Sequence, residues 1–188
     1  MKTAIILHGM PSKNSYYDAS KDAQSNAHWL PWIQQQLLVK DILAQTLELP
    51  APYSPVYEAW KAVFEKFDVN EETILVGHSC GAGFLVRWLS ENKIRTGKVV
   101  LVAPYLDPKH TLSTEFFNFE IDTNVPNRVA DLSLFVSDDD EDYIQTSVDV
   151  LKIKWPEVKI FEMKNKGHFT LGDMGTREFP ELRDFLLA

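Results

Sequence analysis

The sequence predicts an α/β fold with a mostly parallel sheet of about six strands and helices on both faces. Short aliphatic runs alternate along the chain with amphipathic stretches at helical spacing. Several of these runs lack the polar alternation of a half-exposed strand, which is typical of strands buried on both faces of a parallel sheet. Right-handed crossovers between such strands produce a doubly wound sheet.

The elements follow one another without a break in the pattern. Five predicted strands can be named: Ala4–Leu7, Ile74–Val76, Val99–Val102, Leu132–Val136 and Val158–Met163. The predicted helices are Trp29–Val39, Val56–Phe67, Gly81–Leu89, Tyr143–Trp155 and Pro180–Leu187. The last helix begins with proline, which suits the first helical position. Residues 107–128 fit neither pattern, and we expect them to form an irregular excursion over the sheet.

Length and composition narrow the class of protein. No linker, low-complexity tract or repeat divides the 188 residues, so we expect a single domain over residues 1–188. The 19 Lys and Arg against 27 Asp and Glu give a formal net charge of −8, which argues against nucleic-acid binding. One cysteine excludes an internal disulfide framework. No apolar run is long enough for a signal peptide or membrane span, so we expect a cytoplasmic protein without membrane association.

The strongest motif is Gly77-His78-Ser79-Cys80-Gly81, which lies between a predicted strand and a predicted helix. G-x-S-x-G in this context is typical of a nucleophile elbow, the sharp turn that exposes a serine in α/β-hydrolases. The glycines leave room where side chains would collide with neighbouring elements. The helix N-terminus directs backbone N–H groups toward a developing oxyanion. The motif therefore predicts Ser79 as a nucleophile.

A serine nucleophile needs a base, and His168 is the best candidate. In this fold the acid follows the serine and the histidine comes last, so only His110 and His168 qualify among five histidines. His110 falls in the irregular excursion. His168 follows the strand Val158–Met163, and such sites form at the carboxyl ends of parallel strands.

The acid is expected after the strand Leu132–Val136, where the chain reads Ser-Asp-Asp-Asp-Glu-Asp. Asp138 follows the strand too closely to reach across, and Asp142 is expected to cap the next helix. Asp139 and Asp140 remain open, and we favour Asp140.

The same run invites a calcium-loop interpretation, because Asp138, Asp140 and Asp142 occupy alternate positions. Tyr143 stands where such a loop needs glycine, and Asp149 stands where it needs glutamate. The pattern therefore favours a hydrolase acid over a calcium site, and we expect neither a metal nor an organic cofactor.

The oxyanion donors are expected to be the backbone N–H groups of Met10 and Cys80. Met10 follows the first strand after His8-Gly9, and Cys80 follows the nucleophile. Cys80 is a weak rival nucleophile, since its thiol should point away from the catalytic face. His8 itself is equally well explained as a strand-end residue.

Taken together, these motifs resemble the small serine hydrolases grouped around retinoblastoma-binding protein nine and the bacterial YdeN proteins. The resemblance spans nearly the whole chain and rests on His8-Gly9, His28-Trp29-Leu30-Pro31-Trp32, Trp60, Gly77-His78-Ser79, Val100-Leu101-Val102 and Gly167-His168-Phe169. It implies a compact α/β-hydrolase fold without a large lid domain, and the triad Ser79, His168 and Asp140. The family often has proline four residues after the acid, where this chain has Ile144, so Asp139 stays open. The retinoblastoma-binding L-x-C-x-E motif is absent.

The leading hypothesis is a serine hydrolase that cleaves small esters or related acyl compounds through an acyl-enzyme. Its partner would be a small-molecule acyl substrate, and any protein partner is unknown. The alternative is a protein-interaction module on a hydrolase scaffold, with weak or no activity. Trp29 and Trp32 are expected to pack in the core, whereas Phe116, Phe117 and Phe119 are expected to line a substrate pocket.

Overall fold

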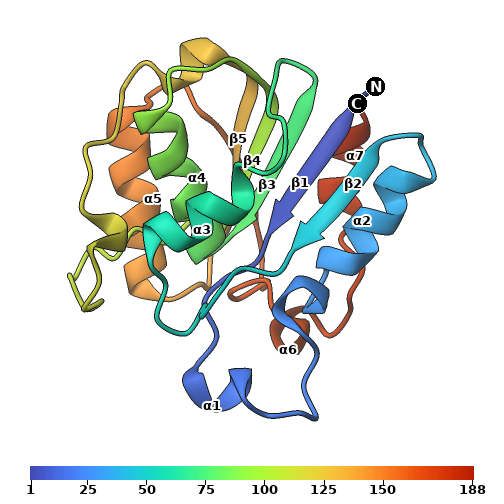
Figure 1. Cartoon of the computed structure of the whole chain (residues 1–188), viewed down its shortest axis with the longest axis vertical. Coiled ribbons are helices and arrows are strands. Elements are labelled where there is room, and N and C mark those ends of the chain that lie inside the picture. The colour runs from blue at the N-terminus through green and yellow to red at the C-terminus, as the bar shows by residue number, and fades with distance from the viewer.

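The computed structural model describes all 188 residues and has the predicted architecture (Figure 1). Six parallel strands form one sheet in the order β2-β1-β3-β4-β5-β6. The strands are β1 (Thr3–Leu7), β2 (Leu43–Leu47), β3 (Thr73–His78), β4 (Thr96–Val102), β5 (Val129–Ser137) and β6 (Lys159–Met163). The helices are α1 (Lys13–Tyr16), α2 (Leu30–Leu38), α3 (Tyr57–Phe64), α4 (Cys80–Glu91), α5 (Asp142–Lys154), α6 (Leu171–Met174) and α7 (Pro180–Leu187).

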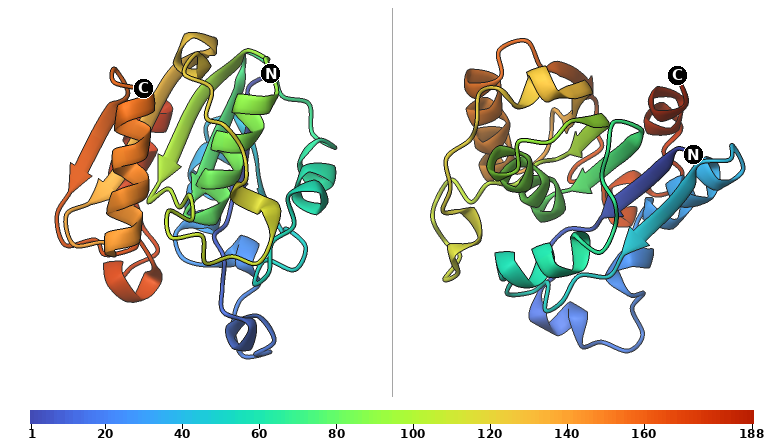
Figure 2. Two further views of the ribbon diagram at one scale, coloured as in Figure 1. Left: turned by 90° about the vertical axis from the view of Figure 1, so that its left-hand side faces the viewer. Right: turned by 45° about the horizontal axis from the view of Figure 1, so that its top comes forward.

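The strand order reverses between β1 and β3. The chain passes from β1 outward to β2, returns to the other side of β1 as β3, and then adds β4, β5 and β6 in sequence. Right-handed crossovers therefore place α3, α4 and α5 on one face, and α2 with its neighbour α7 on the other (Figures 1 and 2). Ligands of such sheets bind outside the carboxyl ends of the strands at the reversal. The fold thus directs attention to the loops after β1 and β3.

The central strands carry the core. Every residue of β3 is buried, and the buried hydrophobic side chains of both layers form one cluster of 46 residues. The prediction of burial on both faces is wrong for the last strand, because four of the five residues of β6 are exposed. This strand is the outermost one and has a partner on one edge only. Its stacking of Phe161 on Phe135 still buries part of its inner face.

The strand β2 lies at the opposite edge and was not among the named predictions. Its sequence Leu-Ala-Gln-Thr-Leu has no continuous aliphatic run, since an edge strand exposes alternate side chains to solvent. The predicted helices occur within three residues of their expected ends. One local expectation is wrong: Glu141, not Asp142, occupies the N-cap of α5, and its side chain makes no capping bond.

Residues 107–128 form the expected excursion, which contains only two short 3₁₀ turns, Glu115–Phe117 and Val125–Arg128. No large extra domain is inserted at this or any other position. The longest helix, α5, has 13 residues. None of the helices combines the length and hydrophobicity that crossing a bilayer requires.

Candidate active site

Ser79 lies on the sharp turn between β3 and α4. Its backbone angles are φ 54° and ψ −118°, a conformation that costs a non-glycine residue of order 1–3 kcal/mol. Three hydrogen bonds hold it there. The Ser79 N–H donates to the Val102 carbonyl at 2.9 Å, and the Ser79 carbonyl accepts from Gly83 and Tyr105 at 3.1 Å each. The serine is therefore fixed by the adjacent strand and by the loop that follows it.

The flanking glycines are sterically required. A Cβ on Gly77 would lie 2.6 Å from the backbone of Ala82, and one on Gly81 would lie 2.4 Å from the His8 carbonyl oxygen. Both contacts are with backbone atoms, so no side-chain movement can relieve them. The G-x-S-x-G spacing therefore reflects how tightly α4 approaches β1 and β3.

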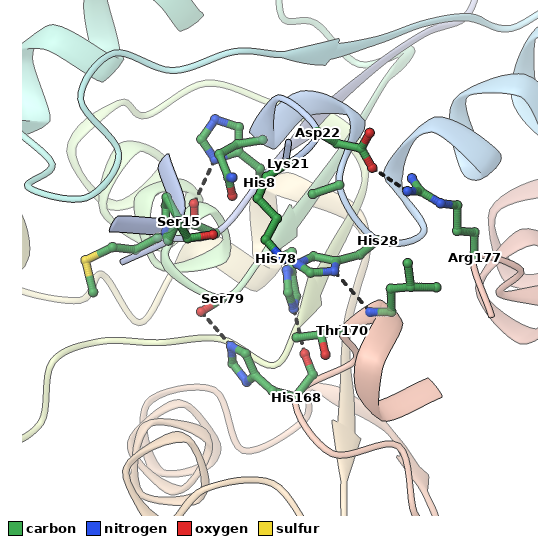
Figure 3. A pocket seen from close by; sticks show the side chains of 16 residues that line it. His8, Ser15, Lys21, Asp22, His28, His78, Ser79, His168, Thr170 and Arg177 are labelled. Carbon is green, nitrogen blue, oxygen red and sulfur yellow. Dashed lines mark hydrogen bonds and ion pairs between the residues drawn. The ribbon is translucent and has the colours of Figure 1, made fainter. Parts of the chain in front are cut away.

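The structure brings Ser79, His168 and Asp140 together, although 89 residues separate the serine from the histidine. His168 Nε2 lies 2.8 Å from Ser79 Oγ (Figure 3), and its Nδ1 lies 3.0 and 3.1 Å from the two carboxylate oxygens of Asp140. The Asp140 side chain is 1% exposed and that of His168 is 24% exposed. A buried carboxylate thus contacts one ring nitrogen, and the other nitrogen faces a hydroxyl group.

The neighbouring carboxylates bind backbone instead. Asp139 Oδ1 accepts hydrogen bonds from Ser137 Oγ at 2.6 Å and from the Gly167 N–H at 2.8 Å, and these bonds lower the pKa of Asp139. Asp138 Oδ1 accepts from the Asn165 N–H at 3.0 Å. Both residues therefore hold the loop that carries His168, and neither contacts its ring. No group of three or more His, Cys, Asp or Glu side chains is arranged to hold a metal ion.

Two further histidines support the His168 loop, and the sequence analysis assigned neither a role. His78 is fully buried, and its Nε2–H donates to the His168 carbonyl at 2.8 Å. His28 Nδ1 accepts from the Leu171 N–H at 3.0 Å (Figure 3). Burial lowers the pKa of both, and the charge of a protonated His168 would lower each further. Both rings are thus neutral supports near pH 7.

Met10 and Cys80 flank Ser79 as expected. Met10 lines the pockets beside the serine, and its N–H donates no hydrogen bond within the chain. As the first residue of α4, Cys80 has no intrahelical acceptor for its N–H. The Cys80 side chain is fully buried, and burial raises the pKa of its thiol, which leaves it unreactive.

His8 connects the segments that follow β1 and β2. Its Nδ1–H donates to the Gly9 carbonyl, and its Nε2 accepts from the Leu49 N–H.

Two pockets meet at Ser79, Met10 and His168. The first, of about 340 Å³, is polar, and it is lined by the segment after β1 and by the residues that follow His168 (Figure 3). Arg177 and Asp22 pair with each other across this pocket. The second, of about 360 Å³, is formed by the loop after β4 together with the start of α5.

The expected aromatic lining is not observed. None of Phe116, Phe117 and Phe119 lines either pocket at Ser79. Phe116 is buried against Trp60 at a ring distance of 4.9 Å, because the excursion folds down onto α3 and α4. The packing expected for Trp29 is confirmed, since this side chain is fully buried.

Asp107 is a buried carboxylate that the sequence analysis did not identify. It lies in the loop after β4 with φ 48°, and its residue is 4% exposed. Its oxygens accept from the Tyr105 hydroxyl, from the N–H and hydroxyl of Thr111, and from the Leu112 N–H, at 2.8–3.0 Å. Only the local sequence Asp-x-x-x-Thr could have signalled this turn.

Known proteins share this fold and sequence pattern. A family model described as "Serine hydrolase" matches residues 17–188. YdeN of Bacillus subtilis (strain 168), a protein named provisionally as a hydrolase, is 27% identical to this chain over 193 residues. The alignment covers 100% of this chain and 95% of YdeN.

Solved structures give the same result. The crystal structure of the ydeN gene product from B. subtilis matches with a TM-score of 0.82 and 24% identity, over 100% of this chain and 97% of the other. Est1E from Butyrivibrio proteoclasticus with bound ferulic acid matches with a TM-score of 0.67 and 11% identity, over 100% and 88%. These likenesses identify the α/β-hydrolase fold, and the resemblance to the YdeN proteins is confirmed. With 172 of its 188 residues spanned by the family model, the chain belongs to the serine hydrolase family.

Proposed function

We propose that the protein is a carboxylesterase-like hydrolase that cleaves small esters through Ser79, His168 and Asp140. The observation that supports this most is the continuous chain of hydrogen bonds from Ser79 Oγ through the His168 ring to the buried Asp140 carboxylate. A serine hydroxyl becomes a nucleophile when a base accepts its proton and an acid orients that base. Membership of the serine hydrolase family is consistent with this chemistry.

In the proposed acylation, Ser79 Oγ attacks the ester carbonyl while His168 Nε2 takes the hydroxyl proton. Asp140 accepts the Nδ1–H of His168, which keeps the ring in the required tautomer and stabilises the imidazolium. The imidazolium then gives its proton to the departing alcohol. The ester C–O bond breaks and the acyl group remains on Ser79.

The tetrahedral oxyanion would be stabilised by the backbone N–H groups of Met10 and Cys80. Two features favour this assignment: both donors lack partners in the chain, and Cys80 begins α4, where the helix dipole is positive. In deacylation, His168 Nε2 takes a proton from a water molecule that attacks the acyl carbonyl, and returns it to Ser79 Oγ as the acyl C–O bond breaks and the carboxylic acid product leaves. Neither step needs a metal or an organic cofactor.

Covalent labelling tests this proposal. A fluorophosphonate probe should form one adduct per chain on Ser79, located by mass spectrometry of the purified protein. Ser79→Ala and His168→Ala should both abolish the adduct while retaining the thermal melt of a folded protein. A panel of small esters should then give turnover. A folded, unlabelled wild-type protein would overturn the esterase proposal and favour an interaction module instead.

A further inference from the structure

The second pocket at Ser79 has aromatic walls. Besides Ser79 and His168, it is lined by Met10, Tyr105, Pro108, Lys109, Thr111 and Tyr143. The rings of Tyr105 and Tyr143 stand edge to face, with centroids 5.6 Å apart and an interplanar angle of 79°. Its volume of about 360 Å³ lies in the range typical of small-molecule sites. Such walls favour a planar ring, because aromatic faces and edges attract one another.

Hydrogen bonds fix the Tyr105 side chain and tie its loop to α5 before any ligand binds. The Tyr105 hydroxyl donates to the buried Asp107, and the Tyr105 N–H donates to the Ser79 carbonyl. The loop is also tied to α5: Ser147 Oγ accepts from the Leu106 N–H at 3.1 Å and donates to the Tyr143 carbonyl at 2.8 Å. The fixed Tyr105 wall therefore loses little conformational entropy on binding.

The two pockets differ in the charged side chains that line them: Lys21, Asp22 and Arg177 line the polar pocket, whereas the aromatic pocket has Lys109 and no carboxylate. In the polar pocket, Arg177 pairs with Asp22. Lys109, at the exposed rim of the aromatic pocket, forms no ion pair with any carboxylate. The nearby Asp107 accepts four hydrogen bonds within its own loop, and burial keeps it from the rim. The aromatic pocket is therefore lined by one lysine and by no carboxylate, although the whole chain is acidic.

We propose that the substrates are esters with an aromatic ring that carries a carboxylate, the ring packing against the Tyr105–Tyr143 pair and the carboxylate facing Lys109. This inference rests on the proposed ester hydrolysis for its chemistry, since the pocket opens directly onto Ser79. It adds a substrate class and two specificity-determining residues, Tyr143 and Lys109. The recognition itself does not depend on a reactive serine.

Binding to a Ser79→Ala protein tests the pocket apart from catalysis. The probes are 4-carboxyphenyl acetate and its uncharged counterpart phenyl acetate, titrated by NMR at low ionic strength. We expect the charged ester to bind about fivefold more tightly, which is about 1 kcal/mol and is typical of an exposed charge pair. The preference should fall as salt is added.

Matched variants in the Ser79→Ala background locate the effect. Lys109→Gln should abolish the preference for the charged ester, whereas Lys21→Gln, which removes a lysine of the polar pocket, should leave it within twofold. Tyr143→Ala should weaken both esters about tenfold, and Tyr143→Phe should restore the binding of both. Equal binding of the two esters, or equal loss in both lysine variants, would overturn the proposal. Failure of Ser79 labelling with intact binding would instead overturn the esterase proposal alone.

Discussion

Two neighbouring strands of the sheet each lead into a loop with a buried aspartate, and the two carboxylates differ in what they contact. Asp107 follows β4 and accepts four hydrogen bonds from fixed donors, all within its own loop or the strand end. Asp140 follows β5 and accepts from the ring of His168, which lies 28 residues further along the chain. One carboxylate thus organises a loop, whereas the other contacts the ring of a histidine from a different loop.

The comparison shows that burial alone does not distinguish a carboxylate that organises a loop from one that contacts a histidine ring. Burial would raise the pKa of Asp107, but the hydrogen bonds from Leu112, Thr111 and Tyr105 outweigh it and hold that pKa below its ordinary value. Asp107 is therefore ionised near pH 7, and both of its oxygens accept hydrogen bonds from its own loop. What separates the two aspartates is the group that each one binds: Asp107 binds donors of its own loop, whereas Asp140 binds a histidine ring from the loop after β6.

The largest expected effect on catalysis is that of Asp140→Asn. An amide at this position cannot hold the Nδ1–H tautomer as the carboxylate does, so kcat for a small ester should fall by about 10³- to 10⁴-fold. The rate of fluorophosphonate labelling should fall in parallel, while the melting temperature changes little. Steady-state kinetics on the purified variant check this.

The adjacent carboxylate provides the control. Asp139→Asn keeps an oxygen that can accept from the Gly167 N–H and does not touch the His168 ring, so kcat should stay within about tenfold of the wild type. A loss as large as that of Asp140→Asn would contradict the assignment of Asp140 as the acid.

A second, smaller effect is expected for Asp107→Asn. The new amide keeps its oxygen for three of the four donors and turns its N–H₂ toward the Leu112 N–H, and an unsatisfied buried donor costs about 1–3 kcal/mol. For a chain of this size, each kcal/mol lowers the melting temperature by about 2–4 °C. Since this residue fixes Tyr105, KM for aryl esters should rise by a larger factor than kcat falls. Calorimetry and kinetics on one preparation would measure both, and the reverse split between kcat and KM would contradict a purely positioning role.

The smallest expected effect is on the pH dependence of stability. The buried histidines and the buried Asp107 should affect stability in different pH ranges. Burial lowers the pKa of His8, His28 and His78, so the unfolded chain binds more protons than the folded one below about pH 6.5. The free energy of unfolding should therefore be constant above this pH and decrease as pH falls below it. Asp107 has a lowered pKa, so its contribution persists above about pH 3.9 and is lost only as pH falls through its folded value.

Thermal melts from pH 7.5 to pH 4.5 measure this window. In His28→Asn, the decrease below pH 6.5 should be smaller by about 1 kcal/mol or less, because one of the three histidines no longer titrates. Asp107→Asn should leave the slope in this window unchanged. An identical pH slope in the His28 variant and the wild type would contradict neutral burial of this ring.

Local sequence was sufficient for the features that depend on neighbouring residues. The G-x-S-x-G motif encodes the turn at Ser79, because the steric demand on Gly77 and Gly81 arises within the strand–turn–helix unit and its nearest strand. The continuous aliphatic runs of β1, β3 and β4 likewise predicted buried strands, since central strands of a parallel sheet need apolar side chains on both faces. The chain order of serine, acid and histidine reduced the choice of base to His168.

Long-range packing set the remaining features. Whether Asp139 or Asp140 contacts His168 depends on how the loops after β5 and β6 meet, and adjacent positions point their side chains in different directions. The exposure of β6 follows from its place at the edge of the sheet, which its apolar sequence does not encode. Phe116 entered the core, whereas Tyr105 and Tyr143 line the pocket, because a pocket wall is made by elements that are distant in sequence. Contacts between such elements depend on the packing free energy of the whole fold, so no local sequence pattern specifies them.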